Sequence, residues 1–168
     1  LIVFVLSTLG TSFKYLVYSP QFGNSHVNFL GRLADILVEE GHDVVVLSPV
    51  LDHTIGTTGT RKARVIEVPQ VEEGKLFSKY MTEGVASRTW THTNFLELFE
   101  IDMDVFVGGW KAQCNATLRN PGLMEKLKTE KFDAAFSESV DYCFAGLFHL
   151  LGIEKFAITE SMAISDGH

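Results

Sequence analysis

Two residues of complementary chemistry, His26 and Glu138, stand where two strands of an expected parallel sheet end. His26 follows the first apolar run after a turn-rich segment, and Glu138 comes directly after the fourth strand expected. An imidazole, with a reference pKa of about 6.5, accepts a proton from a hydroxyl group at neutral pH. A carboxylate bonded to the second ring nitrogen fixes the tautomer and stabilises the imidazolium. The pair is therefore a candidate general base with its orienting acid, serving a nucleophile that a substrate supplies.

Each of the two residues also has a purely structural interpretation. A histidine in the first turn of a helix is often a surface or capping residue, and the helix dipole there favours its neutral form. A carboxylate after a strand is commonly the N-cap of the next helix, and Glu138 stands just before Ser139 and Val140. The fold must bring the two side chains together for the catalytic interpretation to hold.

The elements around the histidine are predicted to form a β-loop-α-β unit. Residues 14–19 are a short apolar run, Asn24 and Ser25 are candidate helix caps, Gly41 ends the helix, and residues 43–48 are a second, continuous apolar run. A right-handed crossover of this length makes the two strands parallel, and ligands of open parallel sheets lie beyond the carboxyl ends of the strands. The apolar stripe of the helix between them comprises Val27, Leu30, Leu33, Ala34, Leu37 and Val38.

The rest of the chain continues this alternation of strands and helices. Further strands are expected at 64–68, 132–136 and 155–159, and further helices at 121–128, capped by Asn120, and at 140–151, closed by Gly152. This order predicts a doubly wound α/β fold with a mainly parallel, Rossmann-like sheet in the strand order 3-2-1-4-5. The first and fourth strands are neighbours in that order, so His26 and Glu138 are expected to enter one crevice.

The composition fits one globular domain and excludes several classes of function. The 168 residues are 46% hydrophobic, which is ample for a core, and the net charge of −7 without a basic stripe argues against nucleic-acid binding. The first strand is followed by neither a GxGxxG nor a P-loop, and no serine has a G-x-S-x-G context. The histidines are scattered, so no metal site is predicted.

The first residues suggest the secretory pathway. Residues 1–12 are apolar and end in small residues, and we interpret them as the remnant of a signal peptide, with the domain itself spanning residues 13–168. The alternative is that residues 1–9 form a buried strand.

Three residues in the second half of the chain agree with that compartment. Asn115, in Asn-Ala-Thr, is a glycosylation sequon. Cys114 and Cys143 could form a disulfide there, although their spacing does not decide it.

Residues 70–111 are rich in aromatic side chains at mostly helical intervals. The structural interpretation is that these side chains pack helices onto the sheet, and the functional one is that together they wall an apolar pocket.

Residues 22–49, FGNSHVNFLGRLADILVEEGHDVVVLSP, resemble the opening of the UDP-glycosyltransferases, and specifically of the membrane-bound UDP-glucuronosyltransferase branch. The His-x-Asn that begins at His26 and the Gly-His at Gly41 fall where that family has them. The run from Cys114 to Glu138 is also similar to a family segment with a cysteine, a leucine-rich helix, Phe-Asp and a strand. The resemblance covers nearly the whole chain.

This resemblance implies a GT-B enzyme with two facing Rossmann-like domains, of which the chain is the amino-terminal, acceptor-binding one. The family's histidine at the position of His26 acts as general base on the acceptor hydroxyl, which attacks the UDP-sugar with inversion and without a metal ion or other cofactor. The family has an aspartate behind that histidine, and the matching position here is Glu138, with Asp141 as the alternative partner. Phe22, Trp90, Phe95 and Phe99 are the candidate acceptor-binding residues, for a small lipophilic acceptor.

The resemblance also implies parts that lie outside these residues. The UDP-sugar, UDP-glucuronate in the branch that the chain resembles, would be bound by a carboxy-terminal half, which a single membrane-spanning helix would follow. The complete protein is then expected in the lumen of the endoplasmic reticulum, anchored in the membrane.

Two other classes of protein remain as alternatives. A secreted α/β binding module for a small apolar ligand, without catalysis, would fit the aromatic stretch equally well. A periplasmic-binding-like or reductase-like Rossmann domain is disfavoured because the glycine fingerprint is missing.

Overall fold

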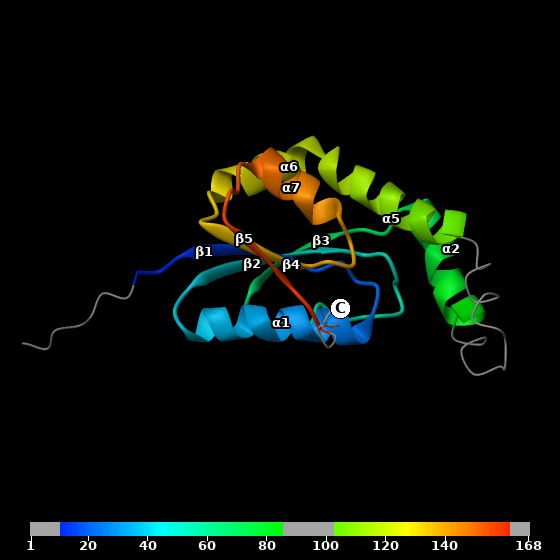
Figure 1. Ribbon diagram of the computed structural model, residues 1–168, viewed down its shortest axis with the longest axis horizontal. Coiled ribbons are helices and arrows are strands. Elements are labelled where there is room, and N and C mark those ends of the chain that lie inside the picture. The colour runs from blue at the N-terminus through cyan, green and yellow to red at the C-terminus, as the bar shows by residue number, and fades with distance from the viewer. Residues whose placement is uncertain (1–10, 86–102, 162–168) are drawn as a thin grey trace, which may run out of the picture.

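The computed structural model describes residues 11–85 and 103–161, and its centre is a five-stranded parallel sheet (Figure 1). The sheet has the order β3-β2-β1-β4-β5, and every neighbouring pair of strands is parallel. This is the strand order that the sequence predicts. The strands are β1 (Lys14–Tyr18), β2 (Asp43–Pro49), β3 (Arg64–Val68), β4 (Ala134–Glu138) and β5 (Phe156–Thr159).

Helices cover both faces of the sheet, as a doubly wound fold requires. Helix α1 (Asn24–Glu39) lies on one face, and α5 (Met103–Leu118), α6 (Pro121–Glu130) and α7 (Cys143–Leu151) lie on the other (Figure 1). Helix α2 (Glu72–Lys79) packs beside α5 at one end of the molecule, and the π-helical segment Tyr80–Val85 follows α2.

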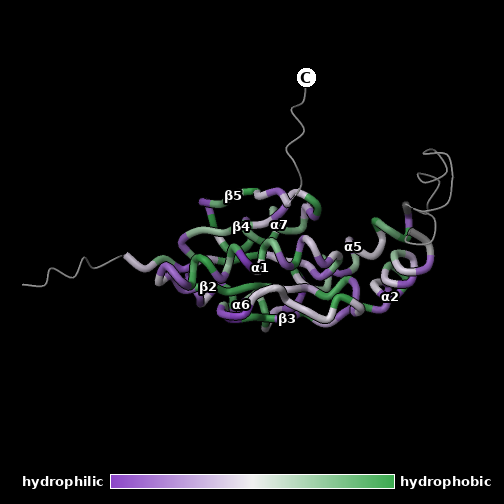
Figure 2. Tube along the Cα trace, turned by 90° about the horizontal axis from the view of Figure 1, so that it is seen from below, coloured by the Kyte–Doolittle hydropathy of each residue, from purple (hydrophilic) through white to green (hydrophobic). Residues whose placement is uncertain are grey.

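The neighbouring strands β1 and β2 contain continuous apolar runs because both of their faces are buried. In β1, Leu16 and Tyr18 belong to the core under α6 and α7, while Val17 belongs to the core under α1. Figure 2 shows β2 and β5 as predominantly hydrophobic tube. Burial of these strands holds the sheet in position. The position of the sheet in turn determines where the segments beyond its carboxyl edge begin.

Helix α1 is held in place by the loop between β2 and β3. Gly59, at φ +72°, and Gly31 approach so closely that a β-carbon on either would collide with backbone of the other segment. Asp35 on α1 is 5% exposed and accepts hydrogen bonds from the backbone N–H groups of Arg61 and Lys62. These contacts fix the helix whose first turn carries His26.

Three of the boundaries that differ from those expected lie near the site. Gly23, rather than Asn24 or Ser25, is the N-cap of α1, and no side chain caps that end. Strand β4 runs to Glu138 instead of stopping two residues earlier, so Glu138 is its last residue. Helix α7 begins at Cys143 because the Asp141 carboxylate accepts the backbone N–H of Cys143 in a turn before the helix.

An ion cluster joins α6 to the amino ends of the strands. The Glu130 carboxylate accepts both guanidinium N–H groups of Arg64 at 3.0 Å and the Lys14 ammonium at 2.7 Å. Arg64 first, and then Lys14, lower the pKa of Glu130 to about 2, against the opposing effect of burial.

Replacing Glu130 with glutamine is expected to lower the free energy of unfolding by about 1–2 kcal/mol at pH 7, since a bidentate, partly buried pair is lost. A carboxylate whose folded pKa is depressed stabilises the fold above its unfolded pKa of about 4.5, and that stabilisation is lost as the pH falls toward 2. The difference in unfolding midpoint between parent and variant should therefore shrink over this interval. Glu125→Gln, on the exposed side of the same helix, is the control, and an equal loss from it would remove the ion cluster as the cause.

Candidate active site at the carboxyl ends of β1 and β4

His26 lies in the first turn of α1, just beyond the carboxyl end of β1. Its side chain is 17% exposed, and its ring packs on that of Phe22, with 4.5 Å between the centroids. A β-carbon at Gly23 would lie 3.1 Å from the ring, so the glycine at the N-cap leaves room for the imidazole. The ring is thereby confined between the turn and the end of the sheet.

Glu138 contacts His26 directly, although 112 residues separate the two along the chain. Its two carboxylate oxygens lie 3.1 and 3.0 Å from Nδ1 of His26, and Glu138 is only 4% exposed. The structure thus brings together the two side chains that the sequence singles out, while their catalytic role stays a prediction.

This geometry selects one tautomer of the imidazole. A carboxylate can only accept hydrogen bonds, so Nδ1 of His26 carries the hydrogen and Nε2 keeps its lone pair. Within the described residues, Nε2 has no hydrogen-bond partner. A partly exposed nitrogen with a free lone pair is what a general base needs.

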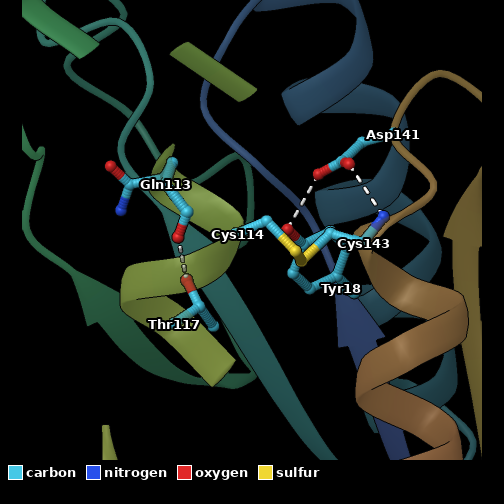
Figure 3. The surroundings of a disulfide bond; sticks show 6 residues. All are labelled: Tyr18, Gln113, Cys114, Thr117, Asp141 and Cys143. Atoms are coloured by element: carbon cyan, nitrogen blue, oxygen red, sulfur yellow. Dashed lines mark hydrogen bonds between the residues drawn. A yellow bond between two sulfur atoms is a disulfide. The ribbon is translucent and has the colours of Figure 1, made fainter. Parts of the chain in front are cut away.

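Asp141 does not contact His26. Its carboxylate accepts the hydroxyl of Tyr18 at 2.8 Å and the backbone N–H of Cys143 at 2.8 Å (Figure 3). Burial raises the pKa of Asp141, an effect that these two hydrogen bonds oppose. Of the two acids considered as partners of His26, the structure therefore places Glu138 beside the ring. Asp141 instead contacts Tyr18, the last residue of β1.

Ser161 is a third member of the site that sequence reasoning missed. Its Oγ lies 3.0 Å from Nδ1 of His26, and its backbone N–H donates to Oε1 of Glu138 at 2.9 Å. It follows β5, the neighbour of β4, by two residues. The rule that places His26 and Glu138 at one sheet edge would also have found Ser161, because residues just past a neighbouring parallel strand reach the same edge.

An aromatic wall extends from the histidine. The Phe22 ring, which packs on His26, lies 4.8 Å from that of Trp110 on α5. Trp110 in turn packs with Phe77 and Leu51 in a buried cluster. The indole Nε1 of Trp110 is buried without a hydrogen-bond partner within the described part of the chain.

A pocket of about 390 Å³ opens beside this wall, between α5 and the β4–α7 connection. Val107, Val140 and Tyr142 are exposed around it, so apolar surface faces solvent at the pocket. The full lining is Phe106, Val107, Trp110, Lys111, Cys114, Val140, Asp141, Tyr142 and Cys143.

Of the four acceptor-binding candidates, only Phe22 can be placed. It forms part of the aromatic wall, whereas Trp90, Phe95 and Phe99 lie outside the described residues. Trp110, from the same aromatic stretch, forms the wall together with Phe22.

A disulfide between Cys114 and Cys143 joins the two sides of this pocket (Figure 3). It ties α5, which carries Trp110, to the start of α7. Asn115, the next residue, is exposed, while Thr117 of the same sequon is buried and its hydroxyl donates to the Gln113 carbonyl. Glycosylation of Asn115 stays a prediction.

Elsewhere in residues 11–85 and 103–161, a more polar pocket of about 520 Å³ lies beyond the ends of β2 and β3, lined by Gln21, Val50, His53, Gly56, Thr57, Thr58 and Glu67. Over the same ranges, histidines, cysteines and acids nowhere gather in threes with the geometry of a metal site. None of the helices described is both long and apolar enough to cross a bilayer.

Comparison with known proteins finds a matching family model and similar curated proteins. The model of the family described as "UDP-glucoronosyl and UDP-glucosyl transferase" matches residues 14–166. A putative UDP-glucuronosyltransferase of Caenorhabditis elegans, ugt-48, is 34% identical over 146 residues, which are 86% of this chain and 27% of that protein. UDP-glucuronosyltransferase 2B17 of Rattus norvegicus is 27% identical over 139 residues, 80% of this chain and 26% of the rat protein.

A solved structure shows the same fold. The glycosyltransferase of kitacinnamycin superimposes with a TM-score of 0.51 over 86% of this chain and 29% of that one, at 16% identity. The fold is that of the Rossmann-like amino-terminal domain of GT-B glycosyltransferases. The chain spans 27% to 33% of the length of the first four relatives that it matches.

Proposed function

This chain belongs to the UDP-glucuronosyl and UDP-glucosyl transferase family, and from that premise we propose that the complete protein is an inverting UDP-glycosyltransferase of the glucuronosyltransferase type. It transfers the sugar of a UDP-sugar, UDP-glucuronate in our proposal, to the hydroxyl group of a small lipophilic acceptor. The observation that supports this best is the contact of Nδ1 of His26 with the Glu138 carboxylate at 3.0 Å.

The chemistry proposed for the pair is general-base catalysis. Nε2 of His26 takes the proton of the acceptor hydroxyl as the oxygen attacks the anomeric carbon of the sugar, and UDP leaves with the electron pair of the broken bond. Glu138 holds the hydrogen on Nδ1 and stabilises the imidazolium that forms. The scheme uses no metal ion and no cofactor beyond the sugar donor.

We place the acceptor in the pocket beside the aromatic wall. Its lining is mostly apolar, and Trp110 connects it through Phe22 to the His26 ring. A lipophilic alcohol or phenol would bury apolar surface there while its hydroxyl reaches Nε2. The volume of about 390 Å³ suits a small molecule.

The donor is proposed to bind outside these residues, in the second Rossmann-like domain that the family has. The chain covers 27% of the length of ugt-48, so other parts of the complete protein would form such a domain. The same holds for the membrane-spanning helix that the resemblance implies.

The experiment is a transfer assay on the complete protein and on this chain made alone. We expect the complete protein to release UDP and glycosylate a phenol when supplied with UDP-glucuronate, with mass spectrometry identifying the product. The chain alone is expected to transfer no sugar, because it would supply the base but not the donor site. Transfer by the chain alone would show that the donor site is misplaced in this proposal.

A binding module without catalysis is the second candidate, and the apolar pocket is the observation that favours it. Such a module needs no base, whereas here a buried carboxylate orients a partly exposed imidazole. If the complete protein binds phenols but releases no UDP from UDP-glucuronate or from UDP-glucose, the binding module is the better description.

A further inference from the structure

We propose that Ser161 is a positioning residue that holds both members of the His26–Glu138 pair in their working geometry, an inference that rests on the proposed function. It makes two separate contacts, one from its backbone and one from its side chain. The segment that carries it is anchored just before it, where the Thr159 hydroxyl donates to the Ser137 carbonyl of β4 at 3.2 Å.

The backbone contact orients the carboxylate. A carboxylate that is 4% exposed needs hydrogen bonds to offset its lost hydration, and the N–H of Ser161 supplies one to Oε1 at 2.9 Å. With Oε1 held by Ser161, Oε2 remains directed at Nδ1 of His26 at 3.0 Å. The orientation of the acid therefore depends on the chain beyond β5.

The hydroxyl contact acts on the imidazole. Nδ1 of His26 has one hydrogen, and three oxygens surround it at 3.0–3.1 Å, two from Glu138 and one from Ser161. Because the carboxylate fixes the hydrogen on Nδ1, the Ser161 oxygen serves as a further acceptor for it. When the acceptor proton moves to Nε2, the ring becomes positively charged and these acceptors bind Nδ1–H more strongly. The Ser161 hydroxyl thus contributes mainly after the proton has moved.

Without the Glu138 carboxylate, the Ser161 hydroxyl would oppose general-base catalysis by His26. A serine hydroxyl alone can donate to Nδ1, which would leave the hydrogen on Nε2 and block the base. Ser161 acts only through the His26–Glu138 pair, so its effect on turnover should disappear when His26 is removed.

The test compares five variants of the complete protein by steady-state kinetics with a phenol acceptor, His26→Ala alone being one of them. Ser161→Ala removes the hydroxyl but keeps the backbone N–H, and we expect kcat to fall about 3- to 10-fold, the effect of one hydrogen bond, with the acceptor KM within about twofold. Ser161→Cys, which keeps the size but offers a weak acceptor, should fall similarly, and Ser161→Thr should restore kcat to within about twofold of the parent. The double variant of Ser161→Ala with His26→Ala should be no slower than His26→Ala alone.

The outcomes separate this inference from the proposed function. If His26→Ala is slow while Ser161→Ala and Ser161→Cys match the parent, the inference is overturned and the proposed function stands. A further loss from Ser161→Ala in the His26→Ala background would also overturn it, since Ser161 would then act elsewhere. If His26→Ala itself keeps full activity, both the inference about Ser161 and the general-base role proposed for His26 are wrong.

A control and a stability measurement exclude a general effect on folding. Ser25→Ala, at the exposed neighbour of His26, should match the parent. The unfolding midpoints of the Ser161 variants should stay within about 2 °C of the parent value, because the partly buried hydroxyl makes one hydrogen bond. A loss of turnover that followed the midpoint across all the variants would mark a structural role and overturn the inference.

Discussion

His26→Ala in the complete protein is expected to lower kcat by at least about 100-fold, the smallest effect usual for losing a general base. The variant removes the group proposed to take the acceptor proton; Phe22 loses its contact with the His26 ring but keeps its contact with Trp110. The acceptor KM should change much less than kcat, because the imidazole acts on the transition state rather than on the apolar part of the acceptor. Initial rates of UDP release over a range of acceptor concentrations measure both.

The matched control is His149→Ala. His149 is exposed in the last turn of α7, and its replacement should leave kcat within about twofold. If His26→Ala stays within a few fold of the parent, the proton is taken by another group or by solvent, and the role proposed for His26 is wrong.

The second large effect is expected for Glu138→Gln, which should lower kcat by about 10³-fold or more. Glutamine keeps the size of the side chain but can donate from its amide nitrogen. An amide that donates to Nδ1 of His26 stabilises the tautomer with hydrogen on Nε2, and that tautomer cannot accept the substrate proton. The loss should appear in kcat, and the unfolding midpoint tells whether the buried amide also weakens the fold.

Two comparisons sharpen this result. Glu138→Asp keeps the charge but shortens the reach, so it should retain clearly more activity than Glu138→Gln. Glu154→Gln, at an exposed site before β5, should have little effect. Equal activity of Glu138→Gln and the parent would mean that the carboxylate has a structural role only.

The sheet and its order could be predicted because they depend on local patterns. Residues 15–18 and 44–47 are apolar runs, and a helix with one apolar stripe joins them, which admits few topologies. Once β1 and β4 are neighbours, His26 and Glu138 follow as partners. Their distance along the chain is irrelevant to that step, because the sheet edge alone brings them together.

The end of β4 was misjudged because a run of apolar residues does not reveal polar residues that are buried in a strand. Phe132 and Asp133 precede the strand, and the Asp133 carboxylate accepts the N–H of Lys14. Ser137 and Glu138 belong to the strand although they are polar, since their side chains find hydrogen bonds at the sheet edge. Ser161 is likewise a polar residue with hydrogen-bond partners, so a search for periodic apolar residues does not find it.

The pocket could not be derived from the sequence for a different reason. Its walls come from α5 and from the β4–α7 connection, and their spacing depends on how α5 packs across the sheet. Helical intervals of aromatic residues fit core and pocket equally well. Only the packing distinguishes buried Phe77, in the core, from Trp110, which reaches both the core and the pocket.

The central position of β1 has a consequence for synthesis on the ribosome. β1 can pair with β2 early, but its other neighbour is β4, and Glu138 follows His26 by 112 residues. At about 5–20 residues per second, the histidine therefore waits on the order of ten seconds for its acid, and slightly longer for Ser161. Until then the unpaired flank of β1 is open backbone, so a nascent chain that stalls within α5 or α6 would be left with a bare strand edge and a histidine without its partner.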